Sequence, residues 1–138
     1  MYFWRKGMSY LKHSSWGRTR QPKNLAGAHG REVETSTSSP SGATAGYATE
    51  NQRYLHLYLD TTTSTDTRTI TVFGYYHAFG VWVALNDTAG NPVAITAAST
   101  TAHKIVEIAG VDRVYFKANS ALNADDEMMA AGSTFQGS

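Results

Sequence analysis

The sequence predicts an all-β protein, an antiparallel β-sandwich of jelly-roll or immunoglobulin-like type, preceded by an extended N-terminal arm. Segments in which apolar and polar residues alternate recur after residue 50, at intervals of about 8 to 15 residues. Turns rich in Gly, Asn, Asp and Thr separate these segments, and no long helical period interrupts them. We therefore expect an arm and tether over residues 1–50 and a sandwich domain over residues 51–138.

The first two expected strands lie on either side of a polar turn. In Tyr54–Asp60 leucines alternate with polar or amphipathic residues, which is the pattern of a half-buried strand. The turn Thr61–Thr67 leads to Arg68–Tyr76, which is rich in β-branched and aromatic residues. One face of this segment carries Ile70, Val72 and Tyr76, and the other face carries Phe73 and Tyr75. Apolar residues on both faces predict a central strand.

The remaining strands are expected as short segments joined by turns. Val81–Asn86 is interpreted as a strand that points Val81, Val83 and Leu85 inward, and the loop Asp87–Pro92 joins it to a strand over Val93–Ala97. A further strand runs from about Thr101 to Ile108. In Arg113–Ala118 the residues that share the inner face are Val114, Phe116 and Ala118, opposite Arg113, Tyr115 and Lys117. The last expected strand is Glu127–Ala131, with an extension toward Phe135.

In residues 1–50 the apolar residues follow neither the helical nor the strand period for long, and glycines and prolines interrupt this segment. Glu34–Thr49 is rich in Ser, Thr, Gly and Ala, and is interpreted as a flexible tether. The preceding residues are too aromatic for a solvated tail, so we expect them to bind a partner surface. The expected anchoring residues of this arm are Tyr2, Phe3, Trp4, Arg5, Lys6, Trp16, Arg18 and Arg20.

Charge is distributed unevenly along the chain. Residues 1–32 hold seven basic residues and one acidic residue, a net charge of +6, and the remainder holds five basic and ten acidic residues, a net charge of −5. This asymmetry favours contact with acidic surfaces or with an oppositely charged copy of the chain.

The expected sandwich domain is small. A domain of its length buries only about 60% of its unfolded surface, so partner subunits are an expected source of stability.

Motifs for chemistry are missing from the sequence. The chain has no cysteine, and its five histidines never fall into a compact ligand spacing. There is no Gly-x-Ser-x-Gly elbow and no phosphate-binding glycine loop. Two acidic stretches, Asp125-Asp126-Glu127 and Asp87–Asn91, lack the ligand pattern of a specific calcium loop. We predict no enzyme activity, no metal and no cofactor.

The sequence shows neither a leader nor a membrane span. Arg5 and Lys6 follow the first four residues at once, and no later stretch approaches about 18 apolar residues. We therefore expect a chain without a signal peptide, made in the cytoplasm, with no membrane partner.

Exposed aromatic residues leave two further binding hypotheses open. The candidates for surface aromatic contacts are Tyr58, Tyr75, Trp82 and Tyr115, and such rings stack on sugars. The alternative, which we favour, is that the rings complete the core or a surface between subunits. The basic, aromatic arm is also suited to nucleic acid. An acidic body would repel that polymer, which argues for a protein partner.

The order of segments between Arg68 and Phe135 resembles small β-domains of tailed-phage virion proteins. The resemblance covers about half of the chain and is a pattern of strands and turns. The residues that carry it are Thr69-Ile70-Thr71-Val72-Phe73-Gly74-Tyr75, Gly80-Val81-Trp82-Val83-Ala84-Leu85-Asn86-Asp87, Gly90-Asn91-Pro92-Val93 and Ile108-Ala109-Gly110-Val111-Asp112-Arg113-Val114-Tyr115-Phe116.

This resemblance implies a non-enzymatic virion structural protein. Such domains serve as head-decorating (cement) proteins, head fibres and tail components, commonly as trimers. It implies a homotrimer on the capsid surface that binds the major capsid protein or other virion proteins. The arm fits such a protein as a segment that ties adjacent capsomers or sister subunits together. The alternatives are a tail or fibre adaptor and, from another class, a carbohydrate-binding module.

Overall fold

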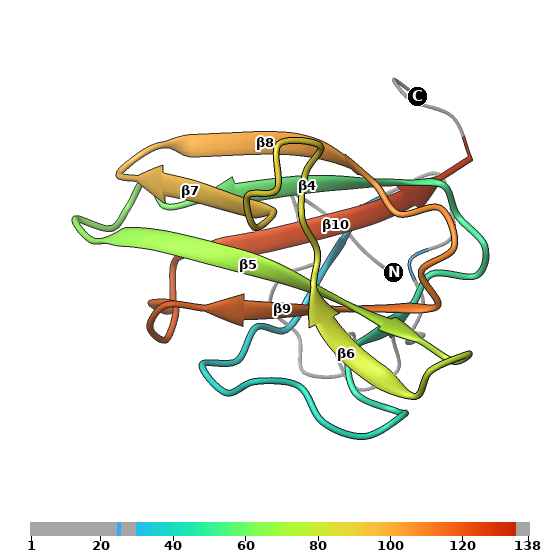
Figure 1. The fold of residues 1–138 in the computed structure, drawn as a ribbon. Coiled ribbons are helices and arrows are strands. Elements are labelled where there is room, and N and C mark those ends of the chain that lie inside the picture. Colours follow the sequence, from blue (N-terminus) through green and yellow to red (C-terminus); the bar gives the residue numbers. More distant parts are fainter. Residues whose placement is uncertain (1–24, 26–29, 135–138) are drawn as a thin grey trace, which may run out of the picture.

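A computed structural model describes residue 25 and residues 30–134, which form an all-β fold of two antiparallel sheets with no helix among them. One sheet has the order β2-β10-β4-β8, with β2 (Arg31–Glu32), β10 (Glu127–Ser133), β4 (Tyr54–Asp60) and β8 (Thr101–Glu107). The other has the order β3-β9-β5-β6, with β3 (Tyr47–Ala48), β9 (Arg113–Ala118), β5 (Thr67–Tyr76) and β6 (Val81–Ala84). The predicted all-β class and antiparallel pairing are confirmed (Figure 1).

Strand β7 (Ala94–Ala98) also pairs with β5. Because β9 takes one edge of β5 along Ile70–Tyr75, β6 and β7 share the other edge, β6 along the second half of β5 and β7 along the first. Val72 marks the change, since its N–H donates to Val93 and its carbonyl accepts from Leu85. The hairpin between β6 and β7 therefore projects from the middle of this edge.

The core lies between the two sheets and follows the predicted alternation. In β4 the leucines at 55, 57 and 59 are fully buried, and in β9 the buried residues are Val114, Phe116 and Ala118. Gly74 leaves space for Leu85 and Val111, because a Cβ at Gly74 would lie 2.7 Å from Leu85 Cδ2. Period-2 patterning thus predicted the inner face of both central strands correctly.

The connections cross between the sheets at most steps. From β2 to β5 the chain alternates sheet by sheet, and from β8 to β10 it alternates again. Only β5, β6 and β7 follow one another within the same sheet. Loops from distant parts of the sequence therefore meet at each end of the sandwich (Figure 1).

The segment expected to be a flexible tether belongs to the folded domain. β2 pairs with β10, β3 pairs with β9, and Ser36 forms a parallel bridge with Lys117. Val33 and Tyr47 are buried in the core, which explains why this Ser- and Thr-rich stretch is held against the sheets. Leu25 is also buried, and its backbone joins Ala48 to Gly132. All eight predicted anchoring residues of the arm, from Tyr2 to Arg20, lie outside the described residues.

Candidate subunit-binding surfaces

Three of the four predicted surface aromatic residues come together on the outer face of the β3-β9-β5-β6 sheet. The Tyr75 and Trp82 ring centroids are 5.1 Å apart, and the Trp82 and Tyr115 centroids are 5.9 Å apart. Strand register causes this, because Tyr75 on β5 lies opposite Trp82 on β6, and Tyr115 points outward from the neighbouring β9. Tyr58 lies on the other sheet, in β4.

Residues 36–46, which we call the 36–46 loop, cover this aromatic cluster. Trp82 Nε1 donates to the Gly42 carbonyl at 2.8 Å, and the Tyr115 hydroxyl donates to the Ser38 carbonyl at 2.9 Å. Tyr75 is only 7% exposed. The polar groups of Trp82 and Tyr115 are therefore bonded to the chain's own backbone, which supports a structural role for these rings over sugar binding.

Arg113 fastens the same loop. Its guanidinium donates to three successive backbone carbonyls, those of residues 44, 45 and 46, at 3.1, 2.7 and 3.0 Å. Lys117 Nζ adds a bond to Ser39 at 3.3 Å. Both cations point outward from β9, and the Arg113 guanidinium forms charge-assisted hydrogen bonds where the loop's carbonyl oxygens gather.

The opposite outer face belongs to the β2-β10-β4-β8 sheet and has a different chemistry. Tyr58 lies between Met129 and His103 in the register, and Glu32 lies beyond Met129. The neighbouring rows add Asp60 with Glu127, His56 with Ile105, and Tyr54 with Glu107. We call these outward-facing residues the Tyr58 face. Its rings and apolar groups are half-buried or exposed, and its carboxylates lie at its margins.

The electrostatics of the Tyr58 face are negative. Burial first, and then the charges of Asp60 and Glu127, raise the pKa of Tyr58 above its usual 10.0. Lys104, which belongs to β8, lies on the other side of that strand from His103 and Ile105, where it is exposed and donates to the Ala94 carbonyl. Arg53, at the edge, pairs with Glu107 at 3.4 Å, and both side chains stay more than half exposed. No described loop is hydrogen-bonded across this face.

Three of the four large apolar residues that are exposed in the described part of the chain lie at the β6 edge, which we define as strand β6 with the preceding turn residue Phe79; the fourth, Ile105, lies on β8. Phe79 is 76% exposed, Val81 46% and Val83 42%. Val81, Val83 and Leu85 are predicted to point inward, but only Leu85 is buried in the core. Both valines do lie on the inner side of β6, opposite Tyr76 and Gly74, but β5 is the only described strand that β6 contacts extensively.

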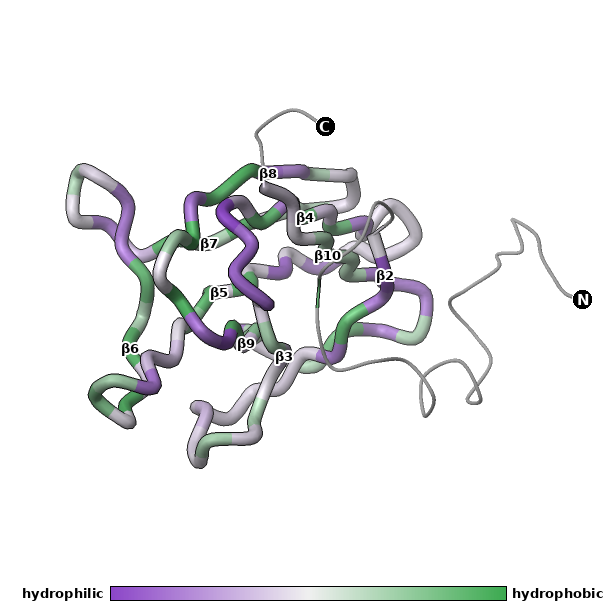
Figure 2. Tube along the Cα trace, turned by 90° about the vertical axis from the view of Figure 1, so that its right-hand side faces the viewer, coloured by the Kyte–Doolittle hydropathy of each residue, from purple (hydrophilic) through white to green (hydrophobic). Residues whose placement is uncertain are grey.

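No charged residue interrupts the β6 edge. The stretch from Ala78 to Asn86 has neither a charge nor a proline, and β6 runs as a hydrophobic strand along the rim of the molecule (Figure 2). Natural proteins usually protect an open strand edge with charges, prolines or a covering segment. This surface could not be predicted from the sequence, because strand alternation gives the side of the strand on which a residue lies but not whether another sheet lies over it.

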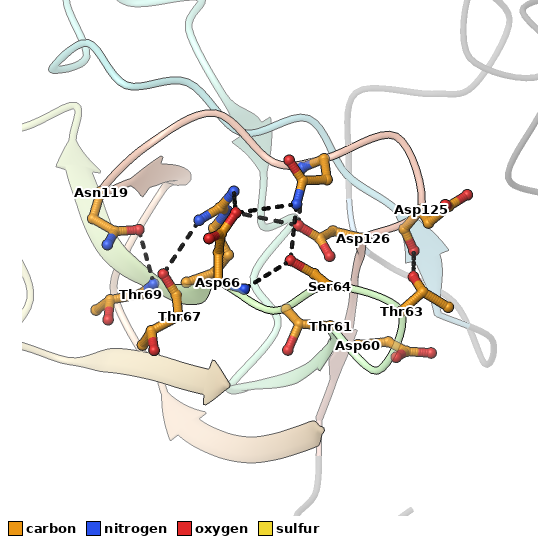
Figure 3. Close-up of polar contacts among 12 residues, drawn as sticks. Asp60, Thr61, Thr63, Ser64, Asp66, Thr67, Thr69, Asn119, Asp125 and Asp126 are labelled. Atoms are coloured by element: carbon orange, nitrogen blue, oxygen red, sulfur yellow. Dashed lines mark hydrogen bonds and ion pairs between the residues drawn. The ribbon is translucent and has the colours of Figure 1, made fainter. Parts of the chain in front are cut away.

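A buried ion pair closes one end of the sandwich and was also missed (Figure 3). Arg68 occupies an inward position on β5, and its Nη2 lies 3.2 Å from Asp66 Oδ2. Its Nε lies 3.6 Å from Oδ2 of Asp126, whose side chain is fully buried. Asn123 completes the group by donating from its backbone to Asp126 and from its side chain to Ser64. This group joins the β4–β5 turn to the β9–β10 loop.

The two stretches weighed as calcium loops are occupied by the chain's own groups. Asp126 faces Arg68, and Asp87 Oδ1 accepts the N–H groups of Ala89 and Asn91 to cap its hairpin. Within the described residues no three His, Asp or Glu side chains are placed to hold a metal ion. The His77 ring packs edge-on against Tyr75, 5.3 Å between centroids, and the backbone N–H of His77 donates to Asp112 Oδ2.

A pocket of about 600 Å³ lies beside this ion pair, between residues 32–37 and the β9–β10 loop. Its lining combines small polar residues with Leu122 and Met128, and includes the carboxylates of Glu32, Glu34 and Asp126. Asp126 Oδ2 already accepts from the Asn123 N–H and faces Arg68, whereas its buried Oδ1 has no hydrogen-bond partner among the described residues.

Among the residues that the structure describes, no helix has the length and hydropathy needed to cross a membrane. Comparisons of the chain with protein-family models, with curated proteins and with solved structures find no match.

Proposed function

We propose that this chain is a non-enzymatic structural protein of a virus particle, of the capsid-decoration type, which works by binding neighbouring protein subunits. The observation that carries the proposal is the β6 edge. An uncharged edge strand with three exposed apolar residues, Phe79, Val81 and Val83, is a surface that another protein covers in the working assembly. Burying it on a partner contributes about 25 cal/mol for each Å² of apolar surface removed from water.

The connectivity supports the jelly-roll alternative over the immunoglobulin-like one. In an immunoglobulin-like sandwich the A–B, D–E and F–G connections stay within one sheet. Here the β2–β3, β3–β4 and β4–β5 connections all cross between sheets. Jelly rolls build viral capsid proteins but also lectins, so the topology agrees with the proposal without selecting it.

The arrangement of the aromatic cluster favours the structural function over carbohydrate binding. A sugar site needs ring faces and polar groups that are open to the ligand. Trp82 and Tyr115 instead donate their polar hydrogens to carbonyls of the 36–46 loop.

Substituting the β6 edge tests the proposal directly. Val83→Lys places a charge on the expected contact, whereas Ser120→Lys adds the same charge to an exposed position at the other end of the sandwich. We expect Val83→Lys to reduce occupancy of the virus particles whose genome encodes the chain by at least tenfold, and Ser120→Lys to leave it unchanged. Unaltered thermal unfolding of both variants establishes that the fold is intact.

The location of the protein provides the second measurement. Antibodies against the domain, visualised by electron microscopy on those particles, are expected to label the capsid surface in many copies. Label on the tail would replace the capsid assignment with the tail or fibre adaptor. Absence of the chain from purified particles would overturn the proposed function altogether.

A further inference from the structure

The Tyr58 face and residues 1–24 are complementary in charge and in apolar content. Residues 1–24 contain six basic and no acidic residues, together with five aromatic residues. The Tyr58 face presents Glu32, Asp60, Glu107 and Glu127 around tyrosine, histidine, Met129 and Ile105 side chains. A basic, ring-rich segment fits such a surface because its rings pack on the apolar rows while its cations meet the marginal carboxylates.

The other outer face shows how this protein covers a sheet. There, ring and guanidinium groups of β6 and β9 hold the 36–46 loop through its backbone carbonyls. The Tyr58 face has rings of its own, but it has carboxylates at its margins where the covered face has Arg113 and Lys117. Its occupant must therefore bring positive charge, which residues 30–134 do not have in excess and residues 1–24 do.

Leu25 fixes the point from which residues 1–24 start. It is buried between the sheets, with its N–H bonded to Ala48 of β3 and its carbonyl to Gly132 of β10. Residues 1–24 therefore join the domain at its rim, between the two sheets, and not above the Tyr58 face. A stretch of 24 residues spans at most about 80 Å, compared with a radius of gyration of about 13 Å for a domain of this size. It is long enough to cross a neighbouring copy.

We infer that residues 1–24 of one copy bind the Tyr58 face of a second copy. The inference rests on the proposed function, in which the chain works by binding subunits, and it names this chain as the subunit. Such a contact joins two different surfaces, so it closes into a ring when the rotation between copies allows it. In such a ring each arm is held near its binding site at a high effective concentration, so contacts that are weak individually can stabilise the assembly together.

Cysteine cross-linking tests the contact in the full-length protein. The chain has no cysteine, so each introduced thiol reports a single position. Ser15→Cys lies in the proposed arm, and His103→Cys lies on the Tyr58 face, where His103 is exposed. After the two variants are folded together and oxidised, we expect a disulfide-linked pair with one chain of each kind. Ser120→Cys, exposed on the β9–β10 loop, is the control partner and is expected to link at least tenfold less.

Two results would overturn the inference. The first is linkage of Ser15→Cys to His103→Cys no faster than to Ser120→Cys. The second is found with the doubly substituted chain, Ser15→Cys with His103→Cys, if its disulfide forms only within one chain. That second result would show that the segment covers its own domain.

Neutralising one carboxylate tests the charge argument. Glu127→Gln removes a charge from the Tyr58 face, and Glu50→Gln removes the same charge from an exposed turn elsewhere. We expect Glu127→Gln to weaken self-association by about three- to tenfold in analytical ultracentrifugation at low salt, and Glu50→Gln to have no effect. The difference is expected to vanish near about 1 M salt. Equal effects of the two variants would contradict the inference.

These measurements use purified protein alone, so they are independent of the location on virus particles. Loss of the arm contact with retained particle labelling would reject the inference and leave the proposed function in place. A stable arm-linked oligomer that is absent from particles would reject the proposed function and leave the arm contact in place.

Discussion

The two outer faces of this sandwich follow the same strand alternation, but among the described residues a loop covers only one of them. On the β3-β9-β5-β6 sheet, the 36–46 loop lies over Tyr75, Trp82 and Tyr115 and is held by Arg113. On the β2-β10-β4-β8 sheet, Tyr58 and its neighbours lie among carboxylates, with no described loop bonded across them. One face is therefore part of the folding unit, and the other is suited to a partner. Substitutions on the first should change stability, and substitutions on the second should change association.

The largest effect is expected at Gly46, where the covered face admits only glycine. Gly46 has a φ of 68°, and a Cβ there would collide with the Val114 carbonyl oxygen. Gly46→Ala is expected to lower the free energy of unfolding by about 2 to 4 kcal/mol, because backbone strain adds to a clash with β9. Urea unfolding followed by tryptophan fluorescence measures this.

Gly42→Ala is the matched control for that substitution. Gly42 lies in the same loop with a φ of 82°, but a Cβ there would meet nothing within 4 Å. It should therefore show only the strain, about 1 kcal/mol. Equal losses for Gly42→Ala and Gly46→Ala would mean that the loop does not press against β9 as described.

A smaller effect is expected from Arg113→Met. The substitution keeps the aliphatic stem but removes the charge-assisted bonds to the carbonyls of residues 44, 45 and 46, and should destabilise the domain by about 1.5 to 3 kcal/mol. Arg53→Met removes the exposed pair with Glu107 beside the Tyr58 face and should change stability by less than about 1 kcal/mol. Equal losses of stability for Arg113→Met and Arg53→Met in thermal unfolding would contradict the difference described between the two faces.

The smallest effect is expected from Tyr58→Phe, and it depends on pH. Burial, Asp60 and Glu127 raise the pKa of Tyr58 in the folded state above the 10.0 of the unfolded chain. The folded state then keeps this proton where the unfolded state has lost it, so stability falls as the pH rises from 10.0 through the folded-state pKa. Tyr58→Phe should lose stability less steeply above that pH and match the parent protein near neutrality. Parallel curves for the two proteins across this range would contradict the assigned environment.

Much of the fold could be predicted from local pattern. The leucines of β4 and the alternating residues of β9 are enriched at every second position, and a period of two leaves one choice of inner face. The same reasoning placed Val81 and Val83 on the inner side of β6, where they do lie, yet both are exposed. Burial there depends on whether the opposing sheet extends that far, and no local pattern encodes this.

The covered face illustrates the same limit. The Ser-, Thr- and Gly-rich composition of residues 34–49 indicates a tether, because few of its side chains are apolar enough to be buried. Its backbone carbonyls are nevertheless held by Arg113 and Tyr115, which lie 67 to 77 residues further along the chain. Arg68 is similar, since its burial depends on Asp126 from a distant loop.

The sequence by itself determined the class of this protein, the inner faces of its central strands and the unequal distribution of charge between residues 1–32 and the rest. These follow from periodicity and composition, which act over a few residues or are simple sums. Only the tertiary structure decided which sheet face is covered, where the β6 edge is exposed, and that Tyr58 lies apart from the cluster of Tyr75, Trp82 and Tyr115. Those outcomes depend on contacts between segments that become neighbours only when the two sheets pack together.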